Sequence, residues 1–266
     1  MRTIAVLGCG NMGGAIIRGI ASGREKIANI KVYDKDLSKV EAICDETGCI
    51  SCSSEIDAVN GYEVVFIAVK PDMVRKLLGE IKDACKGKII VSIAAGVNVY
   101  TFLDILGHNA KVVRTIPNLP AVVGEGLAGL FFHNVSDEDK VYVERLFSSF
   151  GKTVTVYKEE QIDEMIAVTS SSPAYICMFV EALADGAVRA GFNRDDAYKM
   201  ALQTIYGTAK LMLEKNIHPA VLKDQVCSPG GTTIEGVAVL EKAGFRNAVL
   251  EAMTAVSDKV KVLSKG

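Results

Sequence analysis

Short apolar runs alternate with amphipathic stretches over the first half of the chain. Continuous apolar runs between polar residues are typical of strands that a sheet buries on both faces. Such runs predict strands at residues 3–7, 30–33, 64–69, 89–93, 111–115, 126–132 and 152–156. Helical spacing of apolar residues predicts helices at residues 11–22, 38–46, 72–84, 100–106 and 136–150. The alternation favours an α/β fold with a doubly wound, mostly parallel sheet.

The pattern changes near residue 160 and is helical from there onward. Helices are expected at residues 161–168, 173–190, 194–215, 219–224, 233–242 and 245–263. We therefore expect two domains, an α/β domain at residues 1–160 and an all-helical domain at residues 161–266. The segment 174–184 is apolar on nearly every side. It is either a central core helix or a helix that is buried against a second subunit.

The composition indicates a folded, soluble protein. Its 266 residues, 49% of them hydrophobic and 23% charged, suffice for two packed domains. The net charge of −2 offers no basic surface to a nucleic acid. The first apolar run stops at Gly8, too early for a secretion signal, and no stretch approaches the ~18 apolar residues of a membrane span. We expect a cytoplasmic protein that binds neither nucleic acid nor membrane.

The cysteines favour a reducing compartment and no metal. Seven cysteines, an odd number, are scattered through the predicted core, which is typical of reduced thiols. Cys49 and Cys52 have CxxC spacing, but a zinc site would need a second pair of ligands, and the three histidines are isolated. We therefore expect structural thiols.

A glycine motif follows the first predicted strand and opens a helix. It reads Gly8-Cys9-Gly10-Asn11-Met12-Gly13. The first glycine permits a tight turn, the second lets a pyrophosphate approach the backbone, and the third allows close packing of helix and strand. Two further loops follow strands of the same sheet edge, Ala68-Val69-Lys70-Pro71 and Ala94-Ala95-Gly96. These segments predict a dinucleotide site at the carboxyl ends of the strands.

Asp34 ends the second predicted strand, 21 residues after Gly13. A carboxylate there can accept hydrogen bonds from the adenosine ribose, which favours NAD, and it repels the extra phosphate of NADP. Lys35 is adjacent and could offset that repulsion. Asp34 could instead be an ordinary turn or cap residue.

A second candidate anion site lies far from the first. Ser228-Pro229-Gly230-Gly231-Thr232-Thr233 precedes a predicted helix. The first N–H groups of a helix lack partners, and the helix dipole favours negative charge there. Glycines and hydroxyls at such a position suit a small carboxylate. One site for a dinucleotide and one for a small acid suggest hydride transfer.

Motifs along most of the chain resemble the Δ1-pyrroline-5-carboxylate reductase family. They are the glycine motif, the two loops, Ser172-Pro173-Ala174-Tyr175, and the run from Leu222 to Thr233, which is the most specific. The resemblance runs from about residue 3 to about residue 262. It implies a Rossmann-type domain and a helical dimerisation domain, in a homodimer or a larger homo-oligomer. It implies reduction of 1-pyrroline-5-carboxylate to L-proline with NAD(P)H, the last step of proline biosynthesis.

The resemblance also implies roles for individual residues. Thr233 matches the threonine that hydrogen-bonds the ring nitrogen, and it is the candidate catalytic residue. Gln225 matches a position near the nicotinamide that is often asparagine in relatives. The segment 169–173 reads Thr-Ser-Ser-Ser-Pro where the family often has Ser-Gly-Ser-Gly-Pro. The substrate carboxylate would be held by Ser228, Gly230, Gly231, Thr232 and Thr233.

Three questions stay open at this point. The family commonly uses NADPH, whereas Asp34 favours NADH. A hydroxyacid-type dehydrogenase would need a lysine or histidine at the substrate carbonyl, and the only histidine of the helical half is His218. A non-catalytic NAD(P)H-binding sensor would bind the cofactor without turning over an imine.

Overall fold

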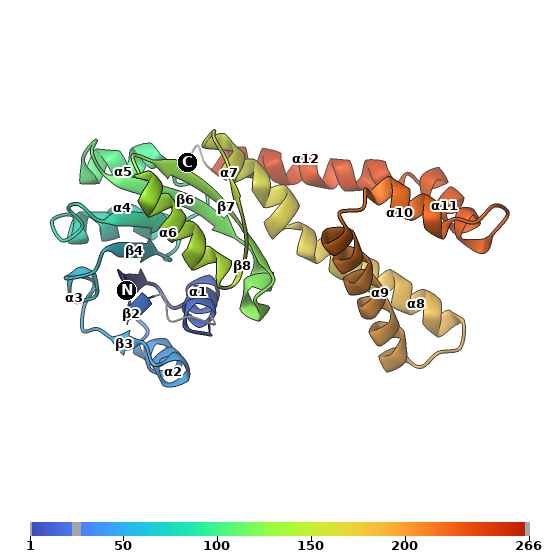
Figure 1. The fold of residues 1–266 in the computed structure, drawn as a ribbon, viewed down its shortest axis with the longest axis horizontal. Helices are drawn as coiled ribbons and strands as arrows, with labels where there is room; N and C mark the ends of the chain where they lie inside the picture. Colours follow the sequence, from blue (N-terminus) through green and yellow to red (C-terminus); the bar gives the residue numbers. More distant parts are fainter. Residues whose placement is uncertain (1, 23–27, 264–266) are drawn as a thin grey trace. The chain divides into compact units, whose positions relative to one another are not determined.

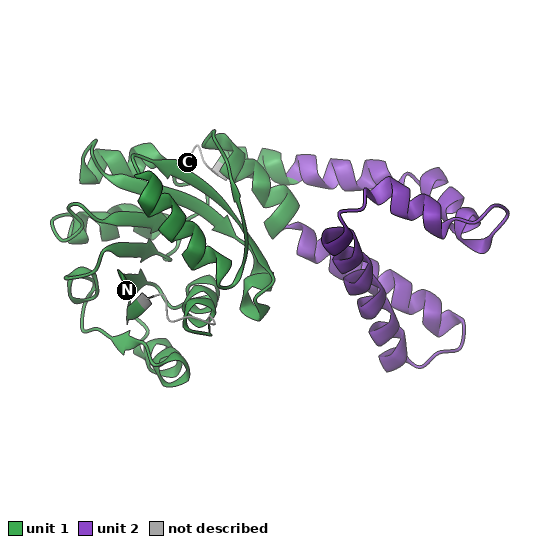
Figure 2. Ribbon diagram, viewed as in Figure 1, with its two compact units in different colours: residues 1–170, 256–266 green, residues 171–255 purple. Residues whose placement is uncertain are grey.

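The computed structural model describes residues 2–22 and 28–263 and divides the chain into two compact units. Unit 1 comprises residues 1–170 and 256–266, and unit 2 comprises residues 171–255 (Figure 1, Figure 2). The division falls at residue 170, whereas the sequence suggested residue 160. The chain leaves unit 1 once and returns to it within its last helix, α12 (Phe245–Leu263).

Unit 1 is built on one mixed sheet. Among the described residues it has eight strands, in the order β3-β2-β1-β4-β5-β6-β7-β8. All neighbours pair in parallel except β6 and β7, which are antiparallel. The strands are β1 (Arg2–Leu7), β2 (Ala28–Tyr33), β3 (Ile50–Ser51), β4 (Val64–Ile67), β5 (Ile89–Ser92), β6 (Lys111–Pro117), β7 (Gly126–His133) and β8 (Gly151–Thr155). The strand order reverses between β1 and β4, where doubly wound sheets bind ligands at the carboxyl ends of the strands.

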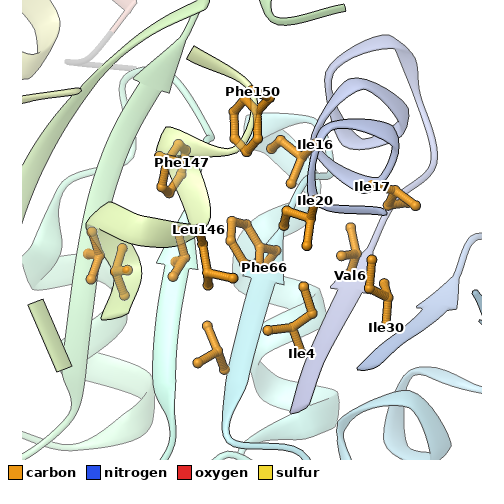
Figure 3. Close-up of a cluster of buried hydrophobic side chains, with 14 of the residues drawn as sticks. Ile4, Val6, Ile16, Ile17, Ile20, Ile30, Phe66, Leu146, Phe147 and Phe150 are labelled. Carbon is orange, nitrogen blue, oxygen red and sulfur yellow. The ribbon is translucent and has the colours of Figure 1, made fainter. Parts of the chain in front are cut away.

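Helices cover both faces of this sheet, and alternate strand residues supply two separate cores. The helices are α1 (Asn11–Ser22), α2 (Leu37–Thr47), α3 (Glu55–Val59), α4 (Pro71–Ile81), α5 (Val99–Leu106) and α6 (Asp137–Ser148). The first core joins α1, α2 and α6 to Ile4, Val6 and Phe66 of the strands (Figure 3). The second joins α3, α4 and α5 to Ala5 and Leu7. Burial on both faces explains why the strands read as unbroken apolar runs.

The sequence predicted the long elements of unit 1 and missed the short ones. The predicted cap Ser136 accepts a hydrogen bond from the Asp139 N–H at the start of α6. Three short elements were not predicted, namely β3, α3 and the 3-10 helix η1 (Leu119–Val123). They have two to five residues each, too few to show a period.

A buried arginine joins the sheet to the helix that follows it. Arg114 of β6 is only 2% exposed. Its guanidinium donates to Glu159 Oε1 at 2.7 Å and to Asp163 Oδ1 at 2.9 Å. Glu159 Oε1 also accepts the Val99 N–H at 2.7 Å, which ties α5 into the same network. This network fixes the start of α7 (Glu160–Met165) against β6.

A second ion network joins β1 and β6 to α6. Asp139 accepts from Arg2 Nη1 at 2.5 Å and from Lys111 Nζ at 2.9 Å. Burial of Asp139 opposes its ionisation, but the hydrogen bonds from Lys111 and Arg2 outweigh it and lower the pKa of Asp139 to about 2. The Asp139 carboxylate therefore stabilises the folded protein at any pH above the pKa that aspartate has in an unfolded chain.

Unit 2 consists of helices that bury little within one chain. They are α8 (Ser172–Arg189), α9 (Arg194–Lys215), α10 (Pro219–Val226), α11 (Thr232–Lys242) and the first part of α12. As predicted, Asn193 caps α9 by accepting the Asp196 N–H. Exposed apolar side chains include Met178 and Phe179 of α8, Leu202 of α9, Val226 of α10, Val239 of α11 and Leu250 of α12. Exposure of the 174–184 segment argues against a core helix and favours burial against a second subunit.

The helices α7 and α8 form one continuous apolar run. A π-helical turn, η2 (Ile166–Ser170), joins them where the sequence suggested a break. Thr169 accepts a hydrogen bond from Asn118 Nδ2 through its carbonyl oxygen at 3.0 Å, which anchors this turn to the loop after β6. The run from Glu160 to Arg189 is long and apolar enough to cross a membrane, with a window of mean hydropathy 1.4. The sequence analysis divided this run into two shorter helices. Core helices of soluble proteins have the same length and composition, so the run by itself does not indicate a membrane span.

The last turns of α12 pack against α7 within unit 1. Lys261 Nζ lies 3.3 Å from Glu164 Oε1. Hydrogen bonds from Ser257 and Lys261 lower the pKa of Glu164. The segment that leaves unit 1 and the segment that returns to it thus contact each other.

Candidate functional site

The glycine motif forms a tight turn between β1 and α1. Gly8 has φ of +108°, a conformation that favours glycine, and its N–H donates to the Tyr33 carbonyl at 2.8 Å. A Cβ at Gly8 would lie 2.5 Å from the Ala68 carbonyl oxygen. A Cβ at Gly13 would overlap the Gly8 carbonyl oxygen. Gly8 and Gly13 therefore let β1, β4 and α1 approach closely, as the motif predicts.

Gly10 differs from these two glycines. It is exposed, and a Cβ built there has no atom of the described chain within 4 Å. No neighbour in residues 2–22 and 28–263 requires glycine at this position. A ligand that lies against the backbone does require it, which is the role that the sequence assigned to the second glycine of the motif.

Asp34 is tied to the glycine turn. Its Oδ2 accepts the Cys9 N–H at 2.6 Å, and its Oδ1 accepts the Asp36 N–H at 2.9 Å. The carboxylate thus joins the end of β2 to the turn after β1. This is a structural role of the kind considered as the alternative to ribose binding. Each oxygen retains a lone pair for a further hydrogen bond.

A cavity of about 460 Å³ opens beside the turn. Seven of the predicted cofactor residues line it: Gly8, Gly10, Asp34, Lys35, Ala68, Val69 and Lys70. Its volume lies within the range of small-molecule sites. The end of β2, the start of α2 and the start of α4 therefore meet at one site, as expected at the reversal of strand order.

Charged residues that the sequence analysis did not single out also line this cavity. Lys39 of α2 lies on its wall and forms an ion pair with Asp36 at 3.1 Å. In all, four carboxylates and four lysines line it: Asp34, Glu55, Asp72 and Glu80, and Lys35, Lys39, Lys70 and Lys76. The four-residue spacing of Lys35 and Lys39 at the start of a helix was the one signal that could have indicated Lys39.

The remaining predicted cofactor residues do not line the cavity. Asn11, Met12 and Gly13 form the first turn of α1, and Pro71 is the first residue of α4. The loop Ala94-Ala95-Gly96 follows β5, and Gly96 has φ of +74°. Gln225 lies on α10 in unit 2 and is exposed.

The second predicted anion site is a turn between α10 and α11. The Gly231 N–H donates to the Ser228 carbonyl at 3.0 Å, and Gly230 has φ of +67°. A Cβ at Gly231 would overlap Ser228 Oγ. Gly231 precedes α11 without any side-chain capping hydrogen bond. The first N–H groups of α11 therefore remain available, as a bound carboxylate would need.

Thr232 and Thr233 occupy the first turn of α11, and both are exposed. Their hydroxyls stand beside the open N–H groups of the helix start. His218, by contrast, caps α10, because its Nδ1 accepts the Ala220 N–H at 3.2 Å. The one histidine of the helical half thus has a structural role, which leaves a hydroxyacid-type dehydrogenase to use a lysine.

Comparison with known proteins identifies the family. The chain is 45% identical to the pyrroline-5-carboxylate reductase of Escherichia coli (strain K12) over 267 aligned residues, 99% of each chain.

The chain belongs to the pyrroline-5-carboxylate reductase family.

Family models and solved structures agree with this assignment. Residues 159–263 match the model of pyrroline-5-carboxylate reductase dimerisation, and residues 3–96 match that of NADP oxidoreductase, coenzyme F420-dependent. The reductase structure from Coxiella burnetii has a TM-score of 0.93 at 31% identity, with 99% of this chain and 98% of that chain covered. The enzyme from Plasmodium falciparum, solved with NADP bound, has a TM-score of 0.86 at 31% identity over the same shares. The predicted family and the predicted fold class are confirmed, and the dimerisation model supports a homo-oligomer.

Proposed function

We propose that the protein reduces 1-pyrroline-5-carboxylate to L-proline by hydride transfer from NAD(P)H, the last step of proline biosynthesis. The observation that carries this proposal is the uncapped start of α11 after the Ser228–Gly231 turn. It supplies a site for a small carboxylate in a chain that also has a dinucleotide turn. A non-catalytic sensor does not account for the carboxylate site. A hydroxyacid-type dehydrogenase would need a lysine or histidine at the substrate carbonyl, whereas His218 caps α10. The family assignment favours neither alternative.

The cofactor site in this proposal is the glycine turn with its cavity. The backbone of Gly8, Gly10 and Asn11 faces the pyrophosphate, and the positive end of α1 stabilises it. The loops after β4 and β5 continue the site toward the nicotinamide. The open space at Gly10 fits a phosphate against the backbone. When bound, NAD(P)H supplies the hydride, and the protein supplies position.

The adenosine end accommodates NADPH in this proposal. Asp34 already accepts two backbone N–H groups, so part of its charge is satisfied before any ribose binds. Lys35 and Lys39 on the cavity wall provide positive charge for a 2′-phosphate. When NADH binds, the remaining lone pairs of Asp34 accept hydrogen bonds from its ribose hydroxyls. We therefore expect both cofactors to function.

The substrate carboxylate binds at the start of α11. The N–H groups that follow Gly231 point out of the helix start, and the hydroxyls of Ser228 and Thr232 stand beside them. The hydroxyl of Thr233 hydrogen-bonds the ring nitrogen and holds the reacting carbon at the nicotinamide. A protonated cyclic imine is already a good hydride acceptor, so orientation supplies most of the catalysis.

The exposed apolar side chains of unit 2 are covered by a second copy of the chain in a homodimer, or in a larger homo-oligomer. An apolar face of this extent is typical of an obligate interface. The apolar run Glu160–Arg189 contributes to that interface in this proposal, and the enzyme works in the cytoplasm without nucleic acid or membrane.

The test is cofactor oxidation by the purified protein with racemic pyrroline-5-carboxylate, run in parallel with NADPH and NADH. Formation of L-proline is the expected result. Cofactor binding without imine turnover would reject the proposal in favour of a sensor.

Thr233→Val tests the role given to Thr233. Loss of one hydrogen bond to the substrate should cost about 1–3 kcal/mol, which lowers kcat/KM roughly 5- to 150-fold. Thr254→Val is the matched control, because Thr254 is exposed on α12 and its hydroxyl donates to the Leu250 carbonyl of the same helix. An undiminished kcat/KM in Thr233→Val would remove Thr233 from the mechanism.

A further inference from the structure

Two cysteine thiols lie in contact at the end of α2. Cys44 is in the last turns of this helix, and Cys49 directly precedes β3. Their Sγ atoms are 3.0 Å apart. Gly48 between them has φ of +70°, and its N–H donates to the Cys44 carbonyl at 2.8 Å. The left-handed glycine therefore reverses the chain and brings the two side chains together.

The CxxC spacing of the sequence indicates a different pair from the one that the fold assembles. Cys52 is buried in the second core, on the α3 and α4 face of the sheet. Cys44 and Cys49 pack against the first core, on the opposite face, beside the buried Cys9. The sheet thus separates Cys49 from Cys52 and leaves Cys44 as its neighbour.

We propose that Cys44 and Cys49 form a reversible intramolecular disulfide on reaction with a peroxide. The sulfur of Cys49 attacks one oxygen of hydrogen peroxide, the O–O bond breaks, and the departing hydroxide takes the thiol proton and leaves as water. The product is a sulfenic acid on Cys49. The sulfur of Cys44 then attacks this sulfur, the S–O bond breaks, and a second water carries away the remaining proton. Two thiols lose two electrons, and one peroxide becomes two waters.

Cys44 takes the second step of this proposal. Burial and the hydrogen bond with Cys49 raise the pKa of Cys44 to about 12, so Cys44 remains a thiol at neutral pH. Cys49 takes the first step in this proposal, and the same disulfide results if the two roles are exchanged. Because the two Sγ atoms are already in contact, the second step needs no encounter between separate molecules. This proximity raises the rate of the step and offsets the small thiolate fraction of Cys44. Cys9 does not compete, because burial and the charge of Asp34 raise its pKa to about 12.

The disulfide would act on the cofactor site, and this part of the inference rests on the proposed function. A bond of about 2.05 Å draws the two sulfurs together beneath Cys9, whose N–H holds Asp34. The helix that carries Cys44 also carries Lys39 on the cavity wall. We expect the oxidised protein to bind the cofactor about fivefold more weakly, and bound cofactor to hinder oxidation by the same free energy.

The test treats the full-length protein with one equivalent of hydrogen peroxide, without cofactor. Cleavage beside Asp45 and Glu46 under non-reducing conditions then separates Cys44 from Cys49 unless a disulfide links them. Linked peptides that a dithiol separates are the expected result. Cys44→Ser and Cys49→Ser should each abolish the link, and Cys52→Ser should retain it.

A link that persists in Cys49→Ser, a link that runs through Cys52, or a sulfinic acid on Cys49 without any link would each overturn the proposal. Titration of reduced and oxidised protein with NADPH tests the coupling. Equal dissociation constants would refute the coupling to the cofactor site. The peptide result does not depend on cofactor or substrate, so its failure is distinguishable from failure of the proposed reductase activity.

Discussion

Replacing Gly10 by alanine separates cofactor binding from folding. A Cβ at this position meets no atom of the described chain within 4 Å, and the residue lies outside the left-handed region. The unfolded chain loses conformational freedom when glycine becomes alanine. The Gly10→Ala protein should therefore be as stable as the parent or more stable by about 0.4–1 kcal/mol.

Cofactor binding should respond in the opposite direction. In the proposed complex the pyrophosphate lies against the backbone of Gly10, in the space that the new methyl group would occupy. Moving the phosphates away from the N–H groups at the start of α1 weakens charge-assisted hydrogen bonds. A loss of about 1.4 kcal/mol raises the dissociation constant about tenfold, which we take as the minimum effect.

Gly8→Ala is the matched comparison. Here the new Cβ would lie 2.5 Å from the Ala68 carbonyl oxygen, and φ is +108°. The backbone conformation alone costs about 1–2 kcal/mol for a residue with a side chain, and the clash with β4 adds to that cost. Gly8→Ala should therefore lower the free energy of unfolding, whereas Gly10→Ala should not.

Urea unfolding gives the stability of each variant, and the fluorescence of NADPH on titration gives its affinity. Parental affinity in a folded Gly10→Ala protein would refute the position assigned to the pyrophosphate. A stable Gly8→Ala protein would refute the steric argument for the turn.

Three further predictions test individual contacts. Lys39→Ala should raise the dissociation constant of NADPH about fivefold or more and spare that of NADH, because only NADPH has a 2′-phosphate for this lysine to pair with; equal changes for both cofactors would contradict the assignment. Asp139 has its pKa lowered to about 2, so it stabilises the folded protein above its unfolded pKa, and about 2 kcal/mol should be lost as the pH falls from about 5 to 2; Asp139→Asn should show a smaller loss in acid unfolding curves. Arg114→Met leaves the Glu159 and Asp163 carboxylates without their partner, and it should lower the free energy of unfolding by about 3–5 kcal/mol in urea, while Arg114→Lys should lose less.

Long periodic elements of this protein can be predicted from sequence, and features that depend on distant residues cannot. The helix Asn11–Ser22 was predicted with its observed ends, because a strand and a glycine turn precede it and its apolar spacing is regular. The antiparallel pairing of β7 with β6 has no signature within either strand. The π-helical turn at Ile166–Ser170 is held by Asn118, a residue far away in the sequence. Local periodicity contains no information on such a contact.

The same distinction applies to the candidate site. The glycine motif could be interpreted from its own residues. A Cβ at Gly8 or Gly13 would meet a backbone atom, and Gly10 lies beside open space. Asp34 was open to two interpretations because its bond to the Cys9 N–H joins two separate strands. Lys39 was missed because its four-residue spacing from Lys35 acquires meaning only once the cavity beside both lysines is known.

The return of α12 to unit 1 has a consequence for biosynthesis. Glu164 leaves the ribosome early, but its partner Lys261 is made only after the whole of unit 2. The sheet and its two cores can form while synthesis continues, because their residues all precede Glu164. The contact between α7 and α12 must wait for the end of translation. A nascent chain that stalls within unit 2 would thus have a folded sheet, while the surface of α7 that α12 later contacts is still exposed. A chaperone that recognises incompletely folded chains would bind there.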